Sequence, residues 1–208
     1  MHWIQVAILF ILGLTGCTAQ ESPRHPWCEM PGRDDPSIPV YRARVPASWE
    51  ARVTADLKTL ADTTKPNAEF FIRDGERQVR LVIHTFPSES LERRIPPQAQ
   101  VARWERQFST LNPISIVKEP KARGGFAGLY FEAEGTLTAS AAPIRVMGWA
   151  MQLDQEHYHV LTYRGLKNLS ADYTLKVTGD PSLMEGHREE IEVFARSFEL
   201  IQEIPSRQ

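Results

Sequence analysis

The chain has 208 residues, of which 24 are Lys or Arg and 26 are Asp or Glu, so its formal net charge is −2 at neutral pH. A charge this close to balance gives no strong field that would attract nucleic acid or an anionic membrane, and we expect no nucleic-acid binding. The length suits one domain with a substantial core, and no internal repeat is visible.

An apolar run from Ile4 to Leu14 opens the chain and ends at small residues followed by Cys17. The run is too short for a membrane-spanning helix, which needs about 20 apolar residues, but it suits a secretory signal peptide. Leu14-Thr15-Gly16-Cys17 resembles the bacterial lipobox. The resemblance implies cleavage after Gly16, transfer of a diacylglyceryl group to the Cys17 thiol and acylation of the new amino terminus. An ordinary secretory signal or a membrane anchor is the alternative.

Residues 1–16 are thus expected to be a lipoprotein signal peptide, and lipidation at Cys17 is the one site assigned. Because each buried methylene contributes about 0.8 kcal/mol, two or three palmitate-like acyl chains hold a protein stably on a membrane. Thr18 follows the cysteine, where an aspartate would suggest inner-membrane retention in many Gram-negative bacteria. We therefore expect a cell-envelope lipoprotein, at the outer membrane rather than the inner membrane.

Residues 17–39 are predicted to be a Pro-rich tether, because they carry five prolines among polar and charged residues and show no apolar period. Trp27-Cys28 within it is expected to make only a local packing contact. If Cys17 carries lipid, Cys28 has no partner for an internal disulfide, and pairing with another chain is the alternative to a passive thiol. The folded domain is expected to span residues 40–203.

The first half of that domain shows three patterns. Residues 40–46 alternate as a half-buried strand does. Between Ser48 and Leu60, apolar residues recur at intervals of three and four, which favours a short helix. A hairpin is predicted from Ala68 to Phe86, with Asp74-Gly75 as its turn.

A second helix is predicted to begin at Pro96-Pro97 and to carry an apolar stripe at Val101, Trp104, Phe108 and Leu111. A short β-branched run follows at residues 114–117. The segment from 118 to 125 is basic and ends in two glycines, and it is expected to be a loop.

Three strands are then predicted as a meander, over residues 126–134, 144–153 and 157–164. The three-residue link between the last two would force antiparallel pairing. A further strand ends at Gly179, and Asp180 is expected to cap a closing helix whose apolar side includes Ile191 and Phe194. The fold class is therefore α+β, a mostly antiparallel β-sheet flanked by two or three helices.

The order of these landmarks resembles the PsbP-like domains. The resemblance is strongest at Asp172-Tyr173-Thr174-Leu175-Lys176-Val177-Thr178-Gly179, followed by a helix and Phe194-Ala195-Arg196-Ser197-Phe198, and it spans residues 40 to about 200. It implies a PsbP-like α/β sandwich. This superfamily includes thylakoid-lumen proteins of photosystem II, Ran-binding import factors and bacterial lipoproteins, in which protein-binding or assembly roles recur. No catalytic signature and no partner-contacting residue is carried over.

His157 and His159 are the candidates for a metal site, since a spacing of two would place both imidazoles on one face of the predicted strand. A usable site needs three or four ligands, and the residues that could help are His84, Glu132, Glu134 and Glu156. We expect solvated or hydrogen-bonded histidines there instead. His84 alternates with apolar neighbours and is expected to be a buried structural imidazole.

Gly124-Gly125 follows Lys121 and Arg123 and could hold an anion, but it lacks the spacing of a phosphate-binding loop, which favours a simple turn. No nucleophile elbow, zinc-protease helix or Cys-x-x-Cys pair occurs. The sequence therefore predicts no enzyme, no cofactor and no metal, but a membrane-anchored lipoprotein that binds or scaffolds an unknown protein partner. The alternative is a small-ligand or metal-binding lipoprotein that uses the His157 and His159 face.

Overall fold

The computed structural model describes residues 25–31, 39–53, 65–86, 90–139, 142–163 and 172–201. The predicted signal peptide, Cys17 and the first part of the tether lie outside these residues. No helix in the described ranges is long and apolar enough to cross a membrane.

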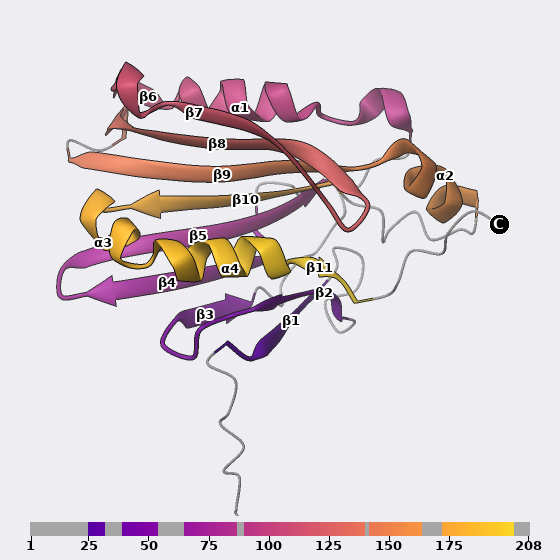
Figure 1. The fold of residues 1–208 in the computed structure, drawn as a ribbon, viewed down its shortest axis with the longest axis horizontal. Coiled ribbons are helices and arrows are strands. Elements are labelled where there is room, and N and C mark those ends of the chain that lie inside the picture. Colours follow the sequence, from indigo (N-terminus) through magenta and orange to yellow (C-terminus); the bar gives the residue numbers. More distant parts are fainter. Residues whose placement is uncertain are drawn as a thin grey trace, which may run out of the picture.

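Two antiparallel sheets form the fold (Figure 1). The larger has eight strands, in the order β3 (Glu50–Val53), β4 (Ala68–Asp74), β5 (Arg77–Phe86), β10 (Asp172–Gly179), β9 (Pro143–Leu153), β8 (Phe126–Leu137) and β6 (Phe108–Leu111), with β7 (Val117–Arg123) also paired to β8. The smaller has three, in the order β1 (Trp27–Pro31), β2 (Pro39–Arg44) and β11 (Glu199–Leu200).

Helices pack on both faces of the larger sheet. We call the face under α1 (Pro97–Glu105) the outer face, and the face under α3 (Pro181–Gly186) and α4 (Arg188–Ser197) the inner face. The remaining helices are α2 (Gln155–Tyr163) and the 3-10 turns η1 (Leu91–Arg93) and η2 (Pro113–Ser115). The predicted α+β class with a mostly antiparallel sheet is confirmed.

On the outer face, α1 covers β8 and β9 with a small separate core. Trp104 is 5% exposed and its ring lies 6.3 Å from that of Phe131 on β8. It also lies against Gly148 on β9, where a Cβ atom would come within 2.3 Å of the Trp104 ring. Only glycine leaves room for this close approach, so Gly148 positions the helix on the sheet.

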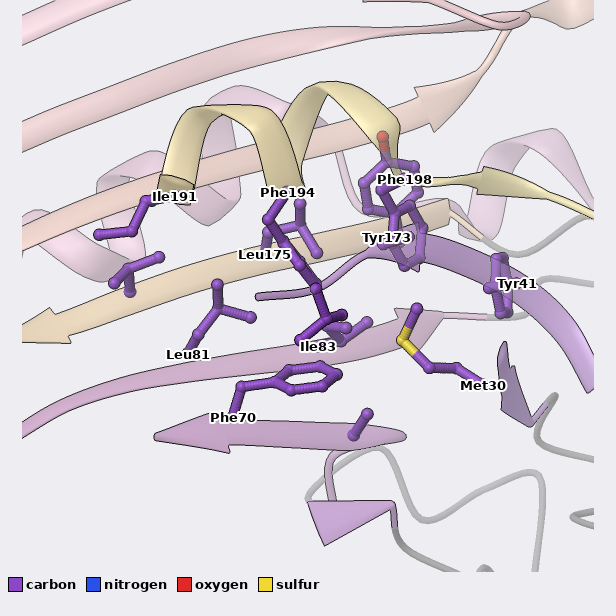
Figure 2. Packing of buried hydrophobic residues seen from close by; sticks show 14 of the residues in the cluster. Met30, Tyr41, Phe70, Leu81, Ile83, Tyr173, Leu175, Ile191, Phe194 and Phe198 are labelled. Atoms are coloured by element: carbon purple, nitrogen blue, oxygen red, sulfur yellow. The ribbon is translucent and has the colours of Figure 1, made fainter. Parts of the chain in front are cut away.

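On the inner face, α4 covers β10, β5 and β4 with the main core. The ring of Phe194 is fully buried and lies 5.3 Å from that of Phe70 and 5.8 Å from that of Trp49. Figure 2 shows Ile191, Phe194 and Phe198 pointing from the helix toward these strands. The smaller sheet joins this core through Tyr41, whose ring stacks on that of Phe198 at 5.3 Å.

Two predictions for the first part of the domain are wrong. The tether segment was expected to contain no strand, but Trp27–Pro31 forms β1 and pairs with β2, with Met30 buried in the main core. The residues predicted as a helix from Ser48 include β3, which pairs with β4, and residues 54–64 lie outside the described ranges. In both places, pairing to a neighbouring strand overrides the weak local pattern.

The second predicted helix and the basic loop also need correction. The helix ends at Glu105, and the last two residues of its stripe, Phe108 and Leu111, lie on β6 while still packing against the outer core. The segment predicted as a basic loop is β7, and only its two glycines form a turn. The sequence of β7 does not distinguish an exposed edge strand from a loop, because nearly all of its side chains are exposed and it has no apolar period.

The predicted strand from His157 is a helix, α2, so the meander does not continue there and β10 takes its place beside β9. The cause is local, since the Asp154 side chain accepts a hydrogen bond from the His157 backbone N–H at 3.0 Å and caps the helix start. The closing helix is also interrupted. It divides at His187 into α3 and α4, and Asp180 caps the first of them as predicted.

Candidate functional site

A groove of about 640 Å³ lies between α4 and β7 on the inner face of the sheet. It exists because α4 packs over β10, β5 and β4 and leaves the inner side of β8 and β9 without a helix. We call it the α4–β7 groove. Its lining comes from β7, β8, β9, β10 and α4, and the side chains are those of Val117, Glu119, Lys121, Ala122, Arg123, Tyr130, Glu132, Trp149, Met151, Tyr173, Arg188, Glu192, Ala195 and Arg196.

Three aromatic residues and a methionine contribute to the apolar lining of the groove, and of these only Trp149 is not buried. The rings of Tyr130 and Trp149 come from neighbouring strands and lie 4.9 Å apart, tilted by 45°. Met151 and Tyr173 extend this surface toward β10, because alternate residues of a strand face the same side. Trp149 is only partly buried. An aromatic side chain of this size that stays partly exposed is suited to a contact surface.

One end of the groove is closed by a carboxylate that is fully engaged. Glu132 on β8 receives two hydrogen bonds from Arg188 on α4, at 3.1 and 2.5 Å, and a third from the Tyr130 hydroxyl at 2.6 Å. Burial alone would raise the pKa of Glu132, but these donors outweigh burial and hold the pKa below its usual value. Burial and the bond to this carboxylate raise the pKa of Tyr130, so both groups keep fixed charge states at neutral pH.

Arg145 on β9 extends this cluster toward α3. Its side chain is 14% exposed and pairs with Glu134 at 2.6 Å, with Glu185 and more distantly with Glu132. Arg188 also reaches Glu185, at 3.1 Å. The two arginines and three carboxylates therefore hold the start of α4 against β8 and β9. Each charged group of the arrangement is already engaged in an ion pair, so the arrangement suits a structural clamp better than proton transfer.

The other end of the groove is cationic. Arg123 lies at the end of β7, and its guanidinium has no ion-pair partner among the described residues. Arg196, at the end of α4, is 62% exposed and its nearest carboxylate, that of Glu192, is 4.0 Å away. Lys121 lies two residues before Arg123 on the β7 wall, pairs with Glu119 at 2.7 Å and has its ammonium 5.5 Å from the centre of the Tyr130 ring. Arg123 and Arg196 are therefore available to an acidic group that enters this end.

The structure does not bring together the histidines that were predicted to share a strand face. His157 and His159 lie on α2, where a spacing of two turns the side chains about 200° apart. The imidazole of His157 bonds to the Asp154 carboxylate and lies against Gly125, and the ring of His159 lies 6.2 Å from that of Tyr158. This geometry contradicts the shared site on which the metal-binding alternative rested.

The residues considered as further ligands also lie apart from these histidines. Glu132 and Glu134 belong to the arginine cluster. His84 stacks with Phe86 on β5 and is only partly buried, so the prediction that it is buried is wrong. Glu156 lies on α2 and is exposed. No group of three or more potential ligands gathers anywhere in the part of the chain that the structure describes.

Gly124 and Gly125 form the turn between β7 and β8, both with positive φ, as the preference for a simple turn predicted. Lys121 and Arg123 precede them on a groove wall. Cys28 lies on β1 and is half-buried against the main core, and burial raises the pKa of its thiol, which makes it a weak nucleophile. It is a free thiol.

Sequence reasoning missed the groove residues for a definite reason. Trp149 and Met151 alternate along β9 with residues of the outer core, so their strand was predicted correctly. The sequence pattern does not show which part of the sheet α4 covers. Arg188 and Arg196 lie about two turns apart on α4, and from the sequence alone both look like solvent-exposed charges. A spacing of eight between them is the signal that could have placed them on one wall.

A second buried ion pair lies outside the groove. Arg94 donates to both carboxylate oxygens of Asp172, at 2.9 and 2.6 Å, and both side chains are less than one-tenth exposed. Asp172 also accepts from the Leu153 backbone N–H at 3.1 Å. Burial raises the pKa of Asp172 although Arg94 opposes this. The pair joins the segment before α1 to the ends of β9 and β10, and its position is structural.

Comparisons with known proteins find similarity in structure alone. Neither the scan of family models nor the search of curated sequences gives a match to this chain. The crystal structure of LpqN from Mycobacterium tuberculosis, described as involved in cell envelope biogenesis, is similar with a TM-score of 0.51 and 10% identity, over 84% of this chain and 90% of that chain. The solution structure of cyanobacterial PsbP from Synechocystis has a TM-score of 0.45 and 10% identity, over 90% and 98%. At this identity, the likeness to LpqN shows that the two proteins share a fold.

Proposed function

We propose that this chain is a lipid-anchored protein of the bacterial cell envelope whose domain binds another protein and performs no catalysis. The lipobox-like Leu14-Thr15-Gly16-Cys17 supports the anchor, and the involvement of LpqN in cell envelope biogenesis is consistent with that location. The observation that carries the binding role is the α4–β7 groove, an aromatic-lined groove in which the large ring of Trp149 is only partly buried.

The lining of the groove is that of a protein contact surface. Aromatic residues, methionine and arginine are enriched at the centres of protein interfaces, and Tyr130, Trp149, Met151 and Arg188 are of these types. The cationic end adds charge selectivity. The occupant we propose is a segment of a partner protein that places an apolar side chain against Trp149 and an acidic group beside Arg123 and Arg196.

The chemistry of the groove also favours binding over catalysis. Its one deeply placed carboxylate, Glu132, is already bonded to Arg188 and Tyr130, so it is not free to act as a base. No histidine, cysteine or serine is among the described residues that line it. A nucleophile with an adjacent base, which acyl or phosphoryl transfer needs, is therefore not part of this surface.

Site-specific photo-crosslinking in intact cells tests the binding role. A photoreactive amino acid in place of Lys121 on the groove wall is expected to give a discrete covalent adduct with one protein, identified by mass spectrometry. The same amino acid in place of Gln78, exposed on β5, is the matched control and is expected to give none. Equal labelling from both positions, or none from Lys121, Trp149 and Arg196 in turn, would contradict the proposal.

Two charge substitutions sharpen that test. Arg123→Glu is expected to abolish the adduct, because it places a carboxylate where the partner's acidic group binds. Arg106→Glu is the control, since Arg106 is also an exposed arginine with no ion-pair partner among the described residues, but it lies after α1 and away from the groove. If both substitutions weaken the adduct equally, attraction by general charge and not the groove is responsible.

The anchor has its own test. Replacement of Cys17 by Ser is expected to abolish lipid attachment, because the hydroxyl cannot form the thioether, and to leave an unprocessed or unlipidated form. Intact-mass measurement of the membrane fraction shows the acyl groups directly. A Cys17→Ser protein that still carries the full acyl mass would contradict the lipobox assignment.

A further inference from the structure

The three-stranded sheet presents one face to the core and one to solvent. On β1 and β2, Met30, Tyr41 and Ala43 are at most 1% exposed and belong to the main core. The alternate positions point the other way, and the pairing places Trp27 opposite Arg44 and Glu29 opposite Arg42. We call this outward surface the Trp27 face. It is made by Trp27, Glu29, Arg42, Arg44 and Glu199.

Trp27 is the central feature of this face. Its side chain is 41% exposed, whereas Trp49 and Trp104 are 6% and 5% exposed. The guanidinium carbons of Arg42 and Arg44 each lie 4.6 Å from the centre of the indole ring. The two cations hold the ring in place on the sheet without covering it, so the indole is presented to the surroundings in a fixed position.

The two arginines differ in their remaining capacity to bind. Arg42 is committed, since its guanidinium pairs with Glu199 at 2.6 Å. The Arg44 guanidinium donates to the His25 carbonyl oxygen, at 3.4 Å, and has no carboxylate partner among the described residues. A guanidinium with free donors matches the paired oxygens of a phosphate group. The face thus combines an exposed indole with an arginine suited to phosphate.

This combination is the one that the headgroup layer of a membrane accepts. Indole rings favour the region between water and acyl chains, where the ring is desolvated and its N–H still finds a partner. The two glutamates of the face balance its two arginines, so attraction does not act at long range, and contact depends on holding the face near the membrane.

The predicted anchor supplies that proximity. Trp27 lies ten residues after Cys17, and an extended chain covers at most about 3.6 Å per residue, so the indole cannot be farther than about 35 Å from the lipidated residue. Tethering of this kind lets a weak contact form with high occupancy. In Figure 1, β1 and β2 lie at the edge of the molecule opposite α1 and β7.

We propose that the Trp27 face rests on the phosphate headgroup layer of the membrane that holds the anchor, with the Trp27 indole in the interfacial region and Arg44 donating to lipid phosphate. The contact rests on the proposed lipidation and concerns a different surface from the α4–β7 groove. It fixes the orientation of the domain and leaves β7 and the groove open to a partner.

Fluorescence quenching by brominated lipids tests this contact. The full processed protein, purified from membranes, is reconstituted into vesicles of phosphatidylethanolamine and phosphatidylglycerol whose acyl chains carry bromine near the headgroup. Tryptophan emission is expected to be quenched in the parent protein. Trp27→Phe is expected to remove most of that quenching, because Trp49 and Trp104 are buried and Trp149 lies in the α4–β7 groove, away from the Trp27 face. Unchanged quenching in Trp27→Phe would overturn the proposal.

The arginine is tested in the same vesicles. Arg44→Gln is expected to reduce the quenching of Trp27 markedly, and Arg106→Gln, on the opposite side, is expected to leave it unchanged. Intact-mass measurement on each sample separates the two proposals. Lipidated protein with unquenched Trp27 contradicts only the membrane contact, whereas protein without acyl groups contradicts the anchor, and the contact with it.

Discussion

The two halves of the large sheet that carry no described helix are very different surfaces. On the outer face of β3, β4 and β5, cross-strand ion pairs join Glu50 to Arg73 and Glu69 to Arg80, and Glu50 also pairs with Arg52 on its own strand. On the inner face of β8 and β9, the corresponding positions hold Tyr130, Trp149 and Met151 beside a cationic end. The first surface satisfies its own charges, whereas the second leaves Trp149 partly exposed and leaves Arg123 without an ion-pair partner among the described residues.

The comparison distinguishes a surface that is suited to solvent from one that is suited to binding. On β4, the ring of Phe71 lies under the guanidiniums of Arg52 and Arg73, at 4.8 and 5.5 Å, and is only 6% exposed. The outer face therefore covers its aromatic residue with its own side chains. In the groove, the Lys121 ammonium lies 5.5 Å from the centre of the Tyr130 ring, but Trp149 beside it stays only partly buried. We assign the contact role to the groove because it leaves this one large ring partly open.

The largest expected effect lies under α4, in the half of the inner face that is covered. Phe194→Ala should lower the free energy of unfolding by about 3–5 kcal/mol, because it leaves a cavity between Phe70 and Trp49. Trp149→Ala removes a larger side chain, but one that is only partly buried, and should lower it by less. Urea denaturation of the two variants checks the order. Equal losses would mean that the groove is ordinary core.

The next largest effect is expected at the clamp between Arg188 and Glu132, which closes one end of the groove. Arg188→Leu removes two charge-assisted hydrogen bonds from Glu132 and should lower the free energy of unfolding by about 2 kcal/mol. Arg196→Leu, at the far end of the same helix, is the matched control and should change it by less than about 0.5 kcal/mol. If Arg196→Leu lost stability and Arg188→Leu did not, the structural clamp would lie at the Arg196 end of α4 and not at the Arg188 end.

The same clamp predicts a pH dependence. Arg188 and Tyr130 hold the pKa of Glu132 below that of an unfolded glutamate, about 4.3. Below that pH, the unfolded state binds more protons than the folded state, so stability falls as the pH falls toward the folded pKa. Glu132→Gln should show a smaller loss between pH 5 and pH 3 in urea midpoints. The pH dependence that comes from other carboxylates with lowered pKa values, such as Asp154, should remain in this variant.

A smaller effect is expected at Lys176, on the outer side of β10. Burial, with Arg103 and Arg80 nearby, lowers the pKa of this lysine to about 8, and its ammonium group donates to the Gln107 side chain. The unfolded lysine keeps its proton up to about pH 10.4, so stability should rise between pH 8 and pH 10. Lys176→Met should remove that rise and add about 1 kcal/mol at neutral pH. A midpoint lowered at pH 7 would contradict this.

Strands with strict alternation could be predicted from the sequence, and the segments whose structure depends on a distant partner could not. β4, β5, β8, β9 and β10 follow the apolar period closely, and Asp74-Gly75 gives the turn between two of them. β1 and β7 have almost no apolar period. β1 lies at the edge of the smaller sheet, where it pairs with β2, and β7 is an exposed edge strand that carries Pro120 and lysines. Both segments become strands because they pair with a neighbouring strand, and their own residues do not indicate this.

The same reasoning explains the candidate site. His157 and His159 were attractive because a period of two describes a strand face, but the Asp154 cap makes the segment a helix and separates the rings. The groove residues, in contrast, come from five elements and become neighbours only when α4 packs beside β9. No local spacing records where a helix ends its cover of a sheet. Cys17 remains a prediction, since it lies outside the described residues.

The smallest expected effect concerns that histidine pair. Replacing both His157 and His159 by Gln should change the free energy of unfolding by no more than about 0.5 kcal/mol, because the Asp154–His157 pair is substantially exposed. Two imidazoles on different sides of α2 also make an incomplete zinc site, so the parent protein should show no tight, stoichiometric zinc binding that survives a chelator. Isothermal titration calorimetry measures this directly. Submicromolar zinc binding that disappears in the double variant would restore the metal-binding interpretation and show that α2 rearranges to bring the two rings together.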